Sequence, residues 1–196
     1  MSISSPLHLE VQELSCGPIQ SLSFTWPTGV NWICGNEGQG KTTLLRLLAG
    51  NIQPTTGSVV TPEGGIFWVD LQDPAHDTAT VQGCWNALRA AYPLWNDDIL
   101  NDLAQALDMS QHLDKRLNML SAGSRRKVML AAALASGATV TLLDQPFTAL
   151  DLGSIAIIQE FLHEAADHPN RTWIVADYTA PDDVPLASVL NLDEAR

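Results

Sequence analysis

Positively charged residues are scarce in this 196-residue chain, which carries 10 Lys and Arg against 22 Asp and Glu and a formal net charge of −12. A nucleic-acid-binding surface needs basic side chains to neutralise the phosphate backbone. A helix that lies flat on anionic lipid needs them for the same reason. We therefore expect no nucleic-acid partner and no direct adsorption to a lipid surface.

Cysteines and long apolar runs are also rare. Cys16, Cys34 and Cys84 are odd in number and match no zinc or disulfide spacing, which favours a reducing compartment. The longest nearly apolar run, residues 128–143, is too short and too interrupted to span a bilayer. The first ten residues lack the basic and apolar regions of a signal peptide. These patterns predict a cytoplasmic domain without a membrane span of its own.

The order of apolar patterns predicts an α/β fold in one domain, for which an apolar fraction of 45% is ordinary. Residues 7–14 and 19–26 alternate apolar and polar residues, as half-buried antiparallel strands do. Residues 58–72 predict two strands around a Pro/Gly turn. Residues 76–136 are mainly helical in pattern, and strands alternate with helices from there on. This alternation is typical of a mostly parallel sheet.

Residues 35–42, GNEGQGKT, fit the P-loop pattern G-x-x-x-x-G-K-[ST] without a gap. Glycines let such a loop curl its N–H groups toward a β-phosphate, and the helix that follows adds its dipole. We expect Lys41 to reach the β- and γ-phosphates and Thr42 to hold Mg²⁺ through its hydroxyl. A strand pattern before the loop and a helix pattern after it make a plain glycine-rich turn the weaker interpretation. The predicted nucleotide-binding residues here are Gly35, Asn36, Glu37, Gly38, Gln39, Gly40, Lys41, Thr42 and Thr43.

The apolar run 139–143 predicts a buried strand that presents the carboxylate of Asp144 at its C-terminal end. The P-loop alone leaves kinases, GTPases and motor ATPases open.

The segment LSAGS, residues 120–124, narrows the choice, because Ser121 lies 23 residues before Asp144 and a helix pattern follows it. A serine hydroxyl and a glycine backbone at a helix N-terminus can bind an anion, although a serine N-cap would explain Ser121 equally well. The order of P-loop, LSAGS and Asp144 resembles that of the ATP-binding cassette (ABC) ATPases, whose signature is LSGGQ.

The resemblance covers about residues 7–193. It implies a P-loop NTPase of the ABC ATPase fold, a single domain over residues 1–196 with an antiparallel β-subdomain and a helical subdomain at about 76–136. It implies that Gln72 is a Q-loop residue that contacts Mg²⁺, together with Thr42 and Asp144. It also implies nucleotide contacts across a dimer interface from Ser121, Ala122, Gly123, Ser124 and the D-loop residue Asp151, which could in addition be a helix N-cap.

The same resemblance implies ATP and Mg²⁺ as cofactors, a second ATPase subunit in a head-to-tail homodimer or heterodimer, and a separate transmembrane transporter subunit. The chain would then be peripheral on the cytoplasmic face of the inner membrane. The short length, LSAGS and PFTALD look most like haem-exporter ATPases of cytochrome c maturation, and short ATPase subunits of other bacterial exporters look similar. The alternative is a cassette ATPase that acts on DNA or ribosomes, but the chain shows no coiled-coil insert, paired cassette or basic surface.

Three positions depart from the family pattern. Gln145 replaces the glutamate that polarises the attacking water, and an amide is a far weaker base. Tyr178 stands best in register with the switch histidine, with Asp177 as the other candidate, and its hydroxyl could donate a hydrogen bond to the γ-phosphate. Residues 15–20 hold no aromatic side chain to stack on adenine, so base stacking is expected to be weak or supplied differently. The candidate catalytic residues are Lys41, Gln145 and Tyr178.

The origin of Gln145 has two explanations from the sequence. Natural decay would suit the missing histidine and would make the chain a degenerate or regulatory ATP-binding module with little hydrolysis. A deliberate Glu→Gln exchange would instead trap the ATP-bound dimer of an otherwise active ATPase.

Overall fold

The computed structural model describes residues 8–69 and 76–194. These residues divide into two compact units. The first, which we call the sheet unit, holds residues 8–66, 139–146 and 162–194. The second, the helical unit, holds the described residues of 67–138 together with 147–161, and so includes the predicted helical segment 76–136.

An antiparallel sheet opens the sheet unit, with strand order β2-β1-β4. Its strands are β1 (Leu9–Cys16), β2 (Ile19–Trp26) and β4 (Thr56–Val60). The buried side chains of β1 are Leu9, Val11 and Leu14. A register shift between Val11 and Leu14 interrupts the alternation of buried and exposed residues, so that Leu14 is buried in place of Glu13. Such a bulge keeps a leucine rather than a glutamate on the buried face. The two predicted N-terminal strands are confirmed.

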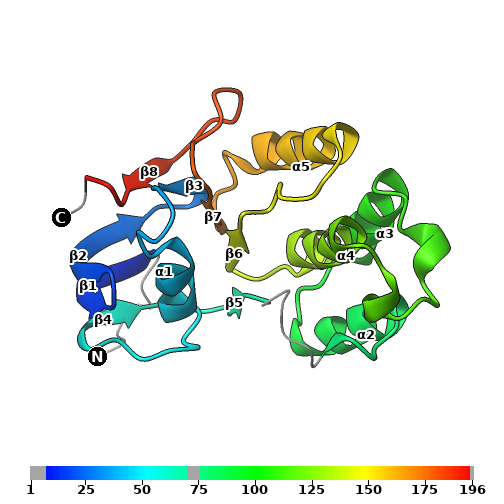
Figure 1. The fold of residues 1–196 in the computed structure, drawn as a ribbon, viewed down its shortest axis with the longest axis horizontal. Helices are drawn as coiled ribbons and strands as arrows, with labels where there is room; N and C mark the ends of the chain where they lie inside the picture. The colour runs from blue at the N-terminus through cyan, green and yellow to red at the C-terminus, as the bar shows by residue number, and fades with distance from the viewer. Residues whose placement is uncertain (1–7, 70–75, 195–196) are drawn as a thin grey trace. The chain divides into compact units, whose positions relative to one another are not determined.

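The second sheet has the order β5-β6-β7-β3-β8 (Figure 1). Strands β3 (Gly29–Cys34), β6 (Val140–Asp144), β7 (Thr172–Ala176) and β8 (Ser188–Asn191) run parallel, and β5 (Ile66–Phe67) is short. Four of the five residues of β6, all five of β7 and five of the six of β3 are buried, which explains their nearly continuous apolar runs. The two strands predicted around the Pro/Gly turn therefore exist as β4 and β5, but in different sheets.

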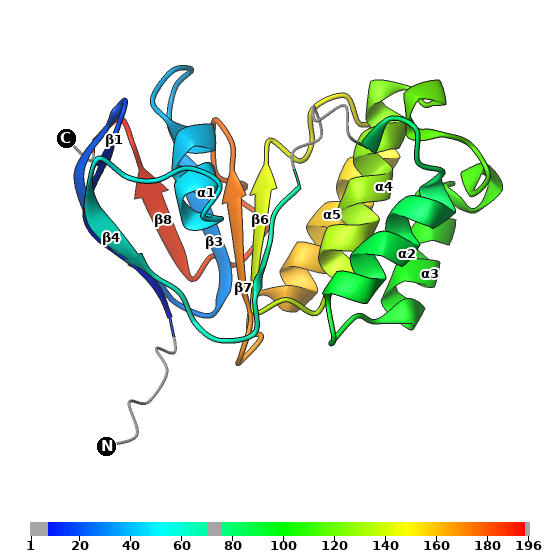
Figure 2. The ribbon, with the colours of Figure 1, turned by 90° about the horizontal axis from the view of Figure 1, so that it is seen from below.

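Helix α1 (Lys41–Leu48) lies between the two sheets of this unit (Figure 2). Its leucines Leu44, Leu45, Leu47 and Leu48 are all buried. These leucines therefore belong to the core, and the N-terminus of the helix stands at the carboxyl end of β3.

The helical unit contains α2 (Val81–Ala91), α3 (Asp97–Ala106), the short 3₁₀ turns η2 (Ser110–His112) and η3 (Leu117–Met119), and α4 (Ala122–Ala135). Its core is α4, which is buried without interruption from Val128 to Ala135. Trp85 of α2 is buried and its indole N–H donates to the Val128 carbonyl at 2.9 Å. Helix α5 (Leu152–Ala165) begins in this unit. Among the helices in the described parts of the chain, none is both long and apolar enough to cross a membrane.

Candidate functional site

The carboxyl ends of three neighbouring parallel strands bring the candidate catalytic residues to one edge of the sheet. Strand β7 pairs with β3 on one side and with β6 on the other. The P-loop follows β3, Asp144 ends β6, and Tyr178 lies two residues beyond β7. Ligands of open α/β sheets bind at this edge. The strand order thus makes one site from segments that are far apart in the sequence.

The P-loop turns directly into α1, whose first turn holds Lys41, Thr42 and Thr43. Gly40 is the N-cap of this helix and has a left-handed backbone with φ of 98°. A Cβ atom added there would lie 2.8 Å from Cγ of Pro18, so both the backbone angle and the space require glycine. The loop residues 35–40 are thereby held against the end of a helix, with the N–H groups of its first turn available to an anion.

The side chain of Lys41 is buried and folded along the loop. Its ammonium donates to the carbonyl of Gly35 and, at 3.0 Å, to that of Asn36. The same ammonium lies 4.6 Å from the centre of the Tyr178 ring. Two of the three candidate catalytic residues therefore contact one another through a cation–π interaction.

The predicted metal-binding residues of the sheet unit also meet. The Thr42 hydroxyl donates to Oδ2 of Asp144 at 2.6 Å, although the two residues are 102 positions apart. A hydroxyl and a carboxylate are oxygen ligands of the kind that Mg²⁺ prefers. These side chains therefore fit a magnesium ion beside the P-loop. The third predicted ligand, Gln72, lies outside the described residues.

Gln145 follows Asp144 at the same strand end. Its N–H donates to the Ala176 carbonyl at 2.8 Å, which ties it to the end of β7. Its backbone is left-handed, with φ of 44°. Such a conformation is uncommon for a residue with a side chain and is found more often at functional sites.

Asp193 is a P-loop contact that the sequence did not indicate. Its two carboxylate oxygens accept from the Asn36 N–H at 3.2 Å each, and Oδ2 also accepts from the Asn36 side-chain amide at 2.9 Å. The Leu192 N–H donates to the Cys34 carbonyl at 2.9 Å, which continues the β8–β3 pairing to the loop. No local pattern could reveal this contact, because it joins residues 157 positions apart.

The LSAGS residues lie in the helical unit, at the start of α4. Ser121 is the N-cap: its hydroxyl oxygen accepts from the Ser124 N–H at 3.1 Å and its hydroxyl donates to the Ser124 side chain at 2.9 Å. Ala122 is the first residue of the helix. A Cβ atom added to Gly123 would lie 2.4 Å from the Ala149 carbonyl oxygen, so the chain segment before α5 passes directly over this glycine.

Asp151 lies at the start of α5 in the same unit and accepts from the N–H and the hydroxyl of Ser154, at 2.8 and 2.9 Å. The Lys127 ammonium donates to the same carboxylate at 2.8 Å. This hydrogen bond from Lys127, with those from Ser154, holds the pKa of Asp151 well below its ordinary value. Asp151 therefore caps α5 and joins it to α4.

The fold and the sheet-edge site define a P-loop ATP-binding protein. A family model described as ABC transporter matches residues 19–148, about two thirds of the chain. The chain belongs to the ABC transporter family. Its architecture is the P-loop fold of ABC ATPases, and the α/β prediction is confirmed.

Relatives of similar length support this assignment. The chain is 35% identical to the cytochrome c biogenesis ATP-binding export protein CcmA of Escherichia coli O157:H7, over 85% of this chain and 86% of that protein. It is 31% identical to CcmA of Pseudomonas savastanoi pv. phaseolicola (strain 1448A / Race 6), over 82% of this chain and 83% of that protein. A solved structure described as an ABC transporter (ATP-binding protein) from Pyrococcus furiosus has a TM-score of 0.77 at 24% identity, covering 96% of this chain and 98% of that chain.

Proposed function

We propose that this chain is the ATP-hydrolysing subunit of an exporter, which binds Mg-ATP in a head-to-tail dimer and drives a separate transmembrane subunit. The observation that carries the proposal is the 2.6 Å contact between Thr42 and Asp144, beside the buried ammonium of Lys41. A cation and two metal-ligating oxygens at a helix N-terminus suit a magnesium–triphosphate group.

The roles of the residues follow from their chemistry. The P-loop N–H groups and Lys41 bind the β- and γ-phosphates, while Thr42 and Asp144 hold the metal. When bound, Mg²⁺ neutralises charge on the phosphate oxygens. Gln145 orients the attacking water through its amide carbonyl, which cannot accept a proton as a carboxylate does. We therefore expect turnover to be slow.

The helical unit supplies the contact to the second ATPase subunit. The N-terminus of the 14-residue helix α4, where the helix dipole favours an anion, is formed by Ser121, Ala122, Gly123 and Ser124. Two large apolar side chains adjoin this region and the start of α5: Met119 is 69% exposed and Leu152 is 85% exposed. Exposed apolar residues beside an anion site suit an interface that forms around nucleotide.

The proposed transmembrane partner follows from the relatives that are named ATP-binding export proteins. A subunit of that kind would be peripheral on the cytoplasmic face of the inner membrane. The formal net charge of −12 supports a protein partner rather than nucleic acid.

A second candidate function is an ATP-binding module that closes on ATP with little hydrolysis. The observation that favours it is Tyr178, whose ring covers the Lys41 ammonium at the place of the expected switch histidine. With Gln145 beside Asp144, the site would retain binding groups while it lacks a strong base.

Single-turnover hydrolysis of Mg-ATP by this chain and by Gln145→Glu separates the two candidates. We expect glutamate to raise the rate about a hundredfold or more, because general-base catalysis contributes 10²–10⁴-fold. The double variant Gln145→Glu with Asp144→Asn is the matched control and should remain slow, because it lacks the metal-holding carboxylate.

Gel filtration of the same proteins in Mg-ATP shows whether each is a monomer or a dimer. A dimer that persists in this chain but dissociates in the Gln145→Glu variant, as that variant hydrolyses its ATP, supports the ATPase. If this chain and Gln145→Glu both fail to hydrolyse ATP, the result contradicts the ATPase and favours the binding module.

A further inference from the structure

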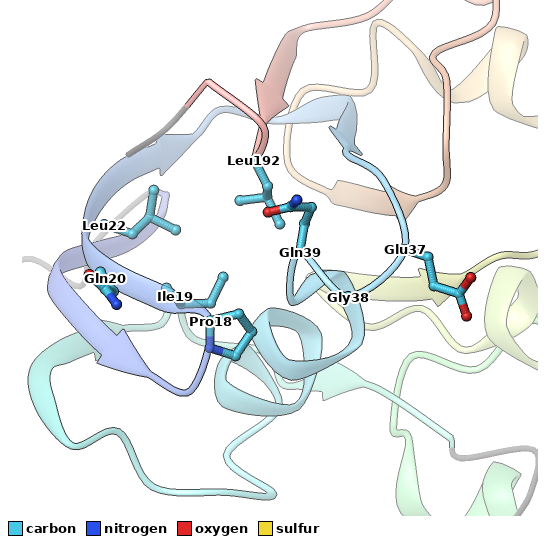
Figure 3. A pocket seen from close by; sticks show the side chains of 8 residues that line it. All are labelled: Pro18, Ile19, Gln20, Leu22, Glu37, Gly38, Gln39 and Leu192. Atoms are coloured by element: carbon cyan, nitrogen blue, oxygen red, sulfur yellow. The ribbon is translucent and has the colours of Figure 1, made fainter.

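The residues that follow β8 hold the beginning of the P-loop. The Leu192 N–H donates to the carbonyl of Cys34, the residue directly before the loop, at 2.9 Å. A Cβ atom added to Gly35 would lie 3.3 Å from Cβ of Leu192 and 3.4 Å from Cβ of Gln39. Leu192 therefore packs against the first glycine of the loop, beside the Gln39 side chain (Figure 3).

Asp193 extends this contact to the second residue of the loop. Its two carboxylate oxygens accept from the Asn36 N–H at 3.2 Å each, and Oδ2 accepts from the Asn36 side-chain amide at 2.9 Å. The Asp193 N–H donates to Oδ1 of Asn191 at 3.0 Å, in a turn of the kind that asparagine side chains form with an N–H two residues on. Hydrogen bonds therefore fix Asp193 both to Asn191, which ends β8, and to the loop.

The peptide that Asp193 holds also helps to hold Lys41. The Lys41 ammonium donates to the Asn36 carbonyl at 3.0 Å and to the Gly35 carbonyl. When a nucleotide binds, we expect the ammonium to turn to the phosphates, and the two carbonyls then lose this donor. The bonds from Asn36 to Asp193 do not involve the lysine. They therefore remain to hold the loop when Lys41 changes partners.

We propose that Asp193 is a positioning residue for phosphate binding, which fixes Asn36 so that the P-loop keeps its shape while Lys41 turns to the phosphates. The inference rests on the proposed function, because the phosphates must occupy the P-loop. Ordering a loose backbone residue costs free energy, which ligand binding must then supply. A loop that is ordered beforehand binds the same phosphates more tightly.

The negative charge of Asp193 acts in the opposite direction, so the sign of the effect separates the two roles. A carboxylate beside a bound triphosphate repels it, and charge alone predicts that removal of Asp193 tightens ATP binding. Positioning predicts that the same removal weakens ATP binding. Asp193 and Asn36 are both exposed, where water and salt screen the repulsion. We therefore expect the loss of positioning to be the larger effect.

Isothermal titration calorimetry of this chain and Asp193→Ala with Mg-ATP and Mg-tripolyphosphate measures the sign. We expect Asp193→Ala to weaken both ligands by the same factor, about tenfold, because Asn36 belongs to the phosphate-binding loop. Unchanged or tighter binding overturns the proposal, and so does a loss that is confined to ATP. If this chain itself binds neither ligand, the result contradicts the proposed function, on which the inference depends.

Two further variants separate the hydrogen bonds from the charge. Asp193→Asn removes the charge but keeps one acceptor oxygen, so it should weaken both ligands by less than Asp193→Ala, and it serves as the test if Asp193→Ala fails to fold. Glu194→Ala is the matched control, because it removes a neighbouring exposed carboxylate that forms no hydrogen bond with the described P-loop residues. It should leave both dissociation constants unchanged. An equal loss in Glu194→Ala and Asp193→Ala overturns the proposal.

A double-mutant cycle with Asn36→Ala tests whether Asp193 acts through Asn36. Residues that share hydrogen bonds lose less binding free energy together than the sum of their separate losses. We expect such a deficit, and fully additive losses overturn the proposal. Single-turnover hydrolysis at saturating Mg-ATP should be equal in this chain and Asp193→Ala, because a fixed loop assists binding rather than the chemical step. A lower rate at saturation would place Asp193 in the chemical step and overturn the proposal.

Discussion

The ammonium of Lys41 contacts two P-loop carbonyls and the face of the Tyr178 ring. A cation–π contact at an exposed ring is worth about 0.5–1 kcal/mol, and Tyr178 is 50% exposed. The ring therefore helps to orient the lysine. A ring face cannot donate a hydrogen bond, so only the hydroxyl of Tyr178 could reach a phosphate as the family histidine does.

We expect Tyr178→His, made together with Gln145→Glu, to raise single-turnover hydrolysis about tenfold or more over Gln145→Glu alone. An imidazole N–H can donate to the γ-phosphate, and one well-placed donor commonly contributes 10²–10³ in rate. Tyr178→Phe in the same background is the control, since it keeps the ring and removes the hydroxyl. An equal gain with phenylalanine would show that the gain does not depend on the imidazole N–H.

The beginnings of α4 and α5 form one connected element within the helical unit. Ser121 caps α4, Asp151 caps α5, and Lys127 of α4 donates to Asp151. The Ala149 carbonyl also passes close above Gly123. Since these contacts join the LSAGS residues to the predicted D-loop, we infer that the two segments move together.

The ion pair between Lys127 and Asp151 predicts a pH dependence of stability. The pKa of Asp151 is lower in the folded chain than in the unfolded one. The ionised Asp151 carboxylate therefore contributes its full stabilisation when the pH is above the pKa of the unfolded chain, about 4. This stabilisation is lost as the pH falls through the lower pKa of the folded chain. Asp151→Asn keeps an N-cap residue and removes the charge, whereas Asp151→Ala removes both.

Thermal unfolding of the two Asp151 variants measures this contribution. Asp151→Ala should lower Tm by about 2–4 °C at pH 7, and Asp151→Asn by less. The difference between this chain and Asp151→Asn should hold from pH 8 to about 5 and shrink below about 4. A difference that stays constant down to pH 3 would mean that the charge of Asp151 contributes nothing to stability.

The whole molecule carries a formal net charge of −12, which acts on any assembly of two copies. Two such copies repel one another, and salt screens this repulsion. The Debye screening length falls from about 30 Å at 0.01 M salt to about 10 Å at 0.1 M. Association of the chain with itself should therefore respond to salt in the opposite direction from nucleic-acid binding, which weakens as salt rises.

We expect the dimer formed in Mg-ATP to tighten about threefold or more between roughly 10 and 150 mM NaCl, because screening reduces this repulsion. Sedimentation velocity at a series of protein concentrations would measure it. A parallel titration with duplex DNA at the lower salt concentration should show no binding. Weakening of the dimer by salt would mean that complementary charges at the interface outweigh the net charge.

Features that depend on neighbouring residues were already specified by the amino-acid sequence. The P-loop, its turn into α1 and the N-caps of α4 and α5 each involve residues a few positions apart, so glycine placement and short-range hydrogen bonds specify them. The alternation of strand and helix patterns was enough for the α/β class. The roles expected for Gln145, Tyr178 and the LSAGS residues stay predictions, and Gln72 lies outside the described residues.

Contacts between distant residues depended instead on the folded chain. Thr42 contacts Asp144, and Lys41 contacts Tyr178, because β7 lies between β3 and β6 in the sheet. No local sequence pattern specifies this strand order. Asp193 reaches the P-loop because β8 pairs with the outer side of β3. Pro18 and Ile19 lie against Gly40 because the connection between β1 and β2 packs onto the end of the P-loop. Such contacts arise from burial and sheet order over the whole chain, and no short stretch of residues specifies them.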